Sequence, residues 1–89
     1  METRVAAVSI IVENPDSVEM INNILHDYSQ FVIGRMGIPY QKHNISIISI
    51  VMDAPNDVIS AMTGKLGMLP NVNAKTVYSK FISSDGTKE

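Results

Sequence analysis

The sequence contains one pattern twice, and this repeat limits the folds that the chain can adopt. In each copy an apolar, β-branched run is followed by a proline, Pro15 in the first copy and Pro55 in the second, a shift of 40 residues. Val18 and Val58 keep the same shift and begin the apolar positions of the next segment. Because proline is favoured in the first turn of a helix, and a strand pattern follows each helix pattern, the repeat predicts two strand–helix–strand units in tandem.

The spacing of apolar residues places the individual elements. The expected order is a strand at 4–13, a helix at 16–28, a strand at 31–38, a turn at 39–44, a strand at 45–53, a helix at 55–67 and a strand at 72–81. This βαββαβ order predicts an α+β, ferredoxin-like split βαβ sandwich. In it, two helices cover one face of a four-stranded antiparallel sheet, with the first and third strands in the middle. Residues 1–82 are expected to form this single domain, and residues 83–89 a flexible tail.

The composition excludes several classes of protein. The 89 residues include no cysteine, so neither disulfides nor thiolate metal sites are predicted. Seven basic residues are scattered among nine acidic ones, for a net charge of −2, so a nucleic-acid-binding surface is not expected. No apolar run approaches the roughly 20 residues that cross a bilayer. We therefore expect a cytoplasmic protein that binds neither nucleic acid nor membrane.

The two central strands are predicted to be apolar on both sides. In residues 4–13 and 45–53 both alternating sets of residues consist mostly of Val, Ile and Ala. Two helices cover only one face of such a sheet, and a face open to water normally has alternating polar residues. We therefore expect a homodimer or homotetramer that buries the second face. The alternative is that these residues are merely good strand formers on a solvated face.

The residues expected at this interface are Ile10, Ile48, Ile50 and Met52.

The sequence contains no pattern typical of a catalytic or metal site. His26 and His43 are isolated from one another and from other metal-binding residue types, which favours solvated histidines. Asp16, Asp53 and Asp57 lie at the expected helix starts, where capping and the helix dipole explain them. We therefore predict neither an enzyme nor a bound cofactor or metal.

The segment FVIGRMGIPY, residues 31–40, has a charge and two glycines inside a predicted edge strand. Glycine allows a bend or a close approach, and Arg35 offers planar N–H donors for a carboxylate. The expected interface residues here are Gly34, Arg35 and Met36, and the expected ligand-binding residues are Asn14, Asp16, Arg35 and Gly37. The alternative is that Arg35 protects an exposed strand edge and that the glycines form a bulge.

Three segments resemble those of one protein family. They are FVIGRMGIPY at 31–40, SIISIVMDAPNDVISAMTGKLGMLPNV at 46–72 and AKTVYSK at 74–80. The likeness extends from about residue 3 to residue 80, and its most specific motifs are GRMG, DAPND and GKLG. The family is that of the regulators of iron-only hydrogenase systems, which is similar in fold to ACT domains and to the ligand-sensing half of the nickel-responsive repressor. The resemblance implies a regulatory role.

Two hypotheses for the function follow. The chain has no pattern for a DNA-reading helix motif and lacks the His and Cys ligands of the nickel repressor, so direct DNA control and nickel sensing are not expected. The first hypothesis is a ligand-sensing oligomer, which holds a small molecule at a subunit interface near Asn14 and Asp16. The alternative is a structural adaptor that docks on a hydrogenase-related protein and binds no small molecule.

Overall fold

The computed structural model describes the backbone of residues 2–84 and the side chains of residues 2–80. In chain order the elements are β1 (Glu2–Val12), η1 (Pro15–Ser17), α1 (Val18–Asp27), η2 (Ser29–Phe31), β2 (Val32–Tyr40), η3 (Gln41–His43), β3 (Ile45–Ala54), α2 (Asn56–Gly67) and β4 (Val72–Ser84). The η elements are short 3-10 turns. The predicted βαββαβ order is therefore confirmed. Neither helix in the described part of the chain is long and apolar enough to cross a membrane.

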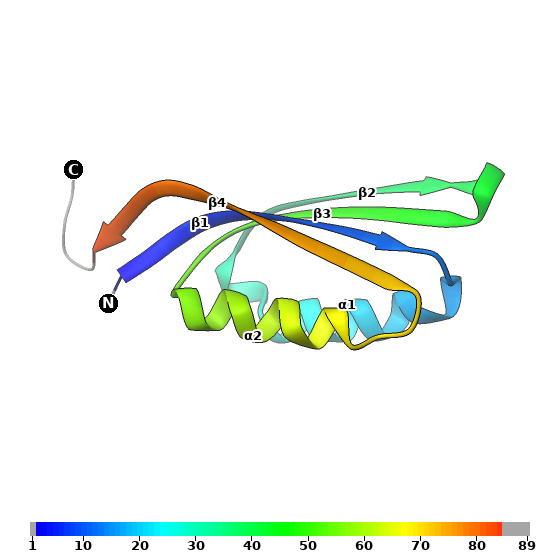
Figure 1. Ribbon diagram of the computed structural model, residues 1–89, viewed down its shortest axis with the longest axis horizontal. Coiled ribbons are helices and arrows are strands. Elements are labelled where there is room, and N and C mark those ends of the chain that lie inside the picture. The colour runs from blue at the N-terminus through cyan, green and yellow to red at the C-terminus, as the bar shows by residue number, and fades with distance from the viewer. Residues whose placement is uncertain (1, 85–89) are drawn as a thin grey trace.

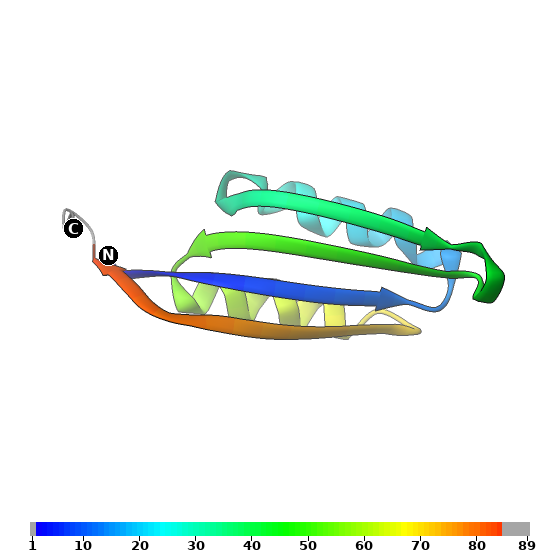
Figure 2. The ribbon, with the colours of Figure 1, turned by 90° about the horizontal axis from the view of Figure 1, so that it is seen from above.

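The four strands form one antiparallel sheet in the order β2-β3-β1-β4. β1 and β3 lie in the middle, as predicted, and β2 and β4 are the two edges. Figure 1 shows both helices against one face of the sheet, and none of the described elements covers the other face. In Figure 2 the strands lie in front of the helices, so the view is onto the uncovered face. This arrangement confirms the predicted ferredoxin-like fold.

Two strand ends differ from the prediction. β2 continues through Pro39, where a turn is predicted. Proline lacks the N–H of a sheet ladder, but an edge strand such as β2 tolerates it. β4 continues to Ser84, and Ser83 and Ser84 pair with β1. The prediction of a tail from residue 83 onwards is therefore wrong for these two residues, while residues 85–89 lie outside the described residues.

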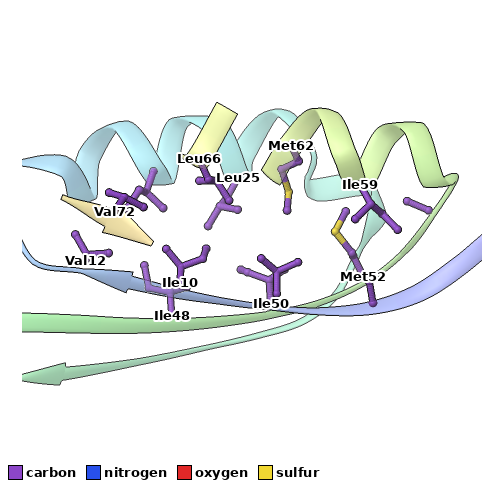
Figure 3. Packing of buried hydrophobic residues seen from close by; sticks show 14 residues of the cluster. Ile10, Val12, Leu25, Ile48, Ile50, Met52, Ile59, Met62, Leu66 and Val72 are labelled. Carbon is purple, nitrogen blue, oxygen red and sulfur yellow. The ribbon is translucent and has the colours of Figure 1, made fainter. Parts of the chain in front are cut away.

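The hydrophobic core lies between the two helices and one face of the sheet (Figure 3). Alternate residues of β1 and β3 point into it, as the period of two in a strand requires. Its largest fully buried apolar side chains are Val8, Ile10 and Val12 of β1, Ile50 and Met52 of β3, Ile21 of α1, and Ile59, Met62 and Leu66 of α2. Full burial of one such side chain contributes roughly 1.5–3 kcal/mol, so this cluster is a main source of stability.

The four residues predicted for an interface on the uncovered face belong to this core instead. Ile10, Ile50 and Met52 are 0% exposed and Ile48 is 5% exposed. Their predicted position is wrong because both alternating sets in the central strands are apolar. The apolar residues alone do not show which set the helices cover. The uncovered face is formed by the other set.

A cap and a buried serine hold the start of α1 in place. Asn14 Oδ1 accepts a hydrogen bond from the backbone N–H of Asp16 at 3.0 Å, and Pro15 lies in the first turn, as the sequence predicts. Ser17 Oγ donates a hydrogen bond to the carbonyl oxygen of Pro70 at 3.0 Å. Turn η1 is thereby attached to the loop between α2 and β4.

Candidate functional site

A groove runs between the start of α1 and the β2–β3 hairpin. Its larger part has a volume of about 230 Å³ and is lined by Val18 of α1, residues 37–39 of β2 and residues 46–48 of β3. A smaller part of about 90 Å³ adjoins it at Pro39 and Ser46 and continues past Pro15. We call the two parts together the α1–β2 groove.

Gly37 is the residue that leaves the groove open. It pairs with Ile48, whose side chain is buried under the helices, so position 37 of β2 faces the helix side of the sheet. A Cβ atom built on Gly37 meets no heavy atom within 4 Å. A larger residue at this position would therefore project its side chain into the groove rather than into packed atoms.

Arg35 is the next residue of β2 on the helix side of the sheet, just beyond the residues that line the groove. It lies two residues from Gly37, about 7 Å along the strand and on the same side of the sheet. Its Nη2 donates a hydrogen bond to Oδ1 of Asn22, which lies one helical turn beyond Val18 on α1. Among residues 2–80, Asn22 is the one hydrogen-bonding partner found for the guanidinium, and its side chain is neutral. The positive charge of Arg35 and most of its five N–H donors therefore remain available beside the groove.

Asn14 and Asp16, the other two residues predicted to bind a ligand, flank the groove without lining it. The groove passes Pro15, which lies between them. Asn14 uses its side-chain oxygen to cap the turn, and the side chain of Asp16 is exposed. The fold thus brings Gly37 into the groove, Arg35 to one of its ends and the Asn14–Asp16 turn to the other.

The three predicted interface residues of β2 do not face the same way. The pairing of β2 with β3 shifts between Val32 and Gly34, so a bulge lies where the glycine pattern suggests one. Met36 pairs with Ser49 and is exposed on the uncovered face. Arg35 instead reaches towards α1. Arg35 and Met36 therefore belong to opposite sides of the sheet.

The uncovered face is a second surface of note. The residues that the strand register places on it, apart from its rim, are Val5, Ala7, Ser9 and Ile11 of β1, Met36, Ile38 and Tyr40 of β2, Ile45, Ile47, Ser49 and Val51 of β3, and Val77 of β4. We call this set the open sheet face. Met36 is 57% exposed and Val77 is 71% exposed. Exposed apolar patches of this kind mark interaction surfaces.

Of these residues, Met36 is the one that the sequence predicts for an interface, although the two central strands contain a signal for the others. Ser9 and Ser49 pair with one another in the two central strands, and Asp53 follows in the same alternating set. Polar residues are expected on the less buried side of a strand. Their shared alternation indicates which side of each central strand lies away from the helices.

The chain is similar to one protein family over most of its length. A family model described as "TM1266-like: Iron-only hydrogenase system regulator, putative" matches residues 4–76. The chain belongs to this family. The family resemblance found in the sequence motifs is therefore confirmed, and the family's description links the chain to the regulation of an iron-only hydrogenase system.

Two solved structures of other proteins are similar in fold to this chain. The first, "uncharacterized protein TM1266 from Thermotoga maritima", is 34% identical over 88% of this chain and 99% of that chain, with a TM-score of 0.84. The second, a formyltetrahydrofolate deformylase from Pseudomonas putida KT2440, is 8% identical over 82% of this chain and 28% of that chain, with a TM-score of 0.59. The second likeness shows the fold alone. None of the curated proteins matches this chain.

Proposed function

We propose that this chain is a small, ACT-like regulatory module that binds a small molecule in the α1–β2 groove and works as a homo-oligomer. The family description supports a regulatory role in an iron-only hydrogenase system. The proposal includes no catalytic step and no cofactor. It places the module in the cytoplasm, in keeping with a sequence that has no cysteine to form disulfides.

The observation behind this proposal is the open space at Gly37 near a guanidinium that has no acidic partner within residues 2–80. The larger part of the groove, about 230 Å³, is below the roughly 300–1,000 Å³ of clefts that hold drug-sized ligands. The ligand is therefore small. Val18 and Ile48 offer apolar contact, and Arg35 is suited to hold a carboxylate by two parallel hydrogen bonds. A short carboxylic acid or an amino acid with an apolar side chain fits this chemistry.

Thermal unfolding in the presence of amino acids and short carboxylic acids tests the binding proposal. A ligand at 100 times its Kd adds about 2.7 kcal/mol of stability, so we expect a clear rise in melting temperature with at least one of them. If none of these compounds shifts the melting temperature, the groove is not a ligand site. The adaptor that docks on a hydrogenase-related protein then becomes the better hypothesis.

Two variants test whether a ligand that shifts the melting temperature binds in the groove. Gly37→Val fills the groove while leaving β2 intact, so we expect the ligand-induced shift to disappear. Arg35→Lys keeps the charge but loses the planar pair of donors, so we expect a smaller shift for carboxylates. Ala61→Gly on the exposed side of α2 is the control and is expected to keep the full ligand-induced shift. A shift that survives Gly37→Val would place the ligand elsewhere.

A further inference from the structure

The open sheet face lacks a covering layer, although its composition is that of a buried surface. It extends over all four strands, and Figure 2 shows that none of the described elements crosses in front of it. The charged residues that the register places on it are Asp53, paired with Val5, and Lys75, paired with Ser9. Asp53 lies near one end of β3 and Lys75 lies on an edge strand. Charge is thus confined to the rim, as in protein–protein interfaces.

We propose that a second copy of this chain covers the open sheet face, sheet against sheet, about a two-fold axis. This inference rests on the homo-oligomer of the proposed function and specifies which surface forms it. The interface is isologous, so each copy contributes the same residues.

The size of the face fits a stable dimer. Four strands about 4.8 Å apart and nine residues at about 3.4 Å each give a surface of roughly 19 by 30 Å. Two stacked copies would therefore bury on the order of 1,100–1,200 Å², near the lower limit of about 1,200 Å² for stable interfaces. This area exceeds the roughly 1,000 Å² expected of a biological interface, so the face is at the small end of what holds a dimer together.

The charges and side-chain sizes on the face suit a second copy. One acidic and one basic residue, Asp53 and Lys75, give the face no net charge, so two copies do not repel one another. Ala7, Ser9 and Ser49 have short side chains and lie together in the two central strands. These short residues let two sheets approach closely in the middle, with larger apolar residues packed around them.

Stacking of the open faces is also favoured over pairing of the β2 edges. Proline at position 39 has no N–H to donate to a further strand, and the bulge near Gly34 bends the edge. The α1–β2 groove lies on the helix side of β2, so a stacked dimer leaves both copies of the groove open to ligand. Successive residues of β2 then face opposite surfaces. Met36 faces the dimer interface, and Gly37 faces the groove.

Mass measurement of point variants by sedimentation or light scattering at micromolar concentration tests the proposal. We expect the wild-type chain to have twice the mass of one chain. Met36→Glu and Val51→Glu place a charge in the interface twice, once from each copy, so each is expected to weaken the dimer by roughly a hundredfold or more and to give monomers. Met68→Glu, at the exposed residue after α2, is the control and is expected to remain dimeric.

Cysteine labelling gives a second measurement that does not depend on how an introduced charge affects folding. The chain has no cysteine of its own, so Ser49→Cys and Met68→Cys each provide a single thiol. We expect a maleimide to label Cys at position 49 slowly at high protein concentration and quickly on dilution. Labelling at position 68 is expected to be fast at both concentrations.

The results separate this inference from the proposed function. A monomeric wild-type chain overturns both the homo-oligomer and the stacked dimer. An oligomer that persists in Met36→Glu and Val51→Glu, together with fast labelling at position 49 at every concentration, overturns the stacked sheets alone. Ligand-induced thermal shifts are measured in the same variants, and a monomer that still binds ligand supports the separation of groove and interface.

Discussion

Ser17 is the buried polar residue among the described side chains, and its environment explains why a serine is needed there. Its hydroxyl donates to the carbonyl oxygen of Pro70, and nearby the backbone N–H of Glu13 donates to the carbonyl oxygen of Asn71 at 2.9 Å. These two bonds join the end of β1 and turn η1 to the loop that leads into β4. The sequence pattern shows a helix start at this point, but the partner is 53 residues away.

Replacement of Ser17 by alanine is predicted to reduce stability by about 1–2 kcal/mol, because the carbonyl of Pro70 loses its donor in a partly buried place. Urea unfolding at fixed protein concentration measures the change. Ser60→Ala, on the exposed side of α2, is the matched control and is expected to leave stability unchanged or slightly raised, since alanine favours helix. Equal stability of Ser17→Ala and Ser60→Ala would show that the hydrogen bond contributes nothing.

At the scale of elements, α2 is a helix with an evident weakness. It buries Ile59, Met62 and Leu66 against the sheet, yet it includes Gly64 within its last two turns. A Cβ atom on Gly64 would meet no heavy atom within 4 Å, and its backbone angles lie outside the region that only glycine adopts easily. The helix therefore depends on its apolar face rather than on the helix propensity of its residues.

Gly64→Ala is predicted to stabilise the protein by about 0.5–1 kcal/mol, because alanine restricts the unfolded chain and meets no clash in the folded one. The reverse change at a comparable exposed position, Ala61→Gly, is predicted to lower stability by a similar amount. Urea unfolding of both variants gives the comparison. A loss of stability in Gly64→Ala would mean that close packing at this point requires glycine.

The prediction for the whole molecule concerns its assembly. If two copies stack through the open sheet face, unfolding is coupled to dissociation, and mass action makes the melting temperature rise with protein concentration. We therefore expect the melting temperature of the wild-type chain to increase steadily between low and high micromolar concentration. Met36→Glu is expected to show a melting temperature that does not depend on concentration. Independence in the wild-type chain as well would contradict assembly.

Local signals in the sequence are sufficient to specify the order and type of the elements in this protein. Proline at positions 15 and 55, apolar residues at helical spacing after each, and β-branched runs between them are local signals, so they specified the βαββαβ order and the two central strands. The motifs of residues 34–37, 53–57 and 64–67 also indicated the family. The bulge near Gly34 is a local feature as well.

Which surfaces these elements present depends instead on how the helices pack against the sheet in the folded chain. Both alternating sets of β1 and β3 are mostly apolar and differ only by a few polar residues such as Ser9 and Ser49. The packing of the helices therefore decides that Ile10 and Ile50 lie inside. The α1–β2 groove likewise depends on the distance between a helix and an edge strand that meet only in the folded chain. Periodicity describes a residue relative to its own strand or helix, whereas a face or a groove is defined by what lies across from it.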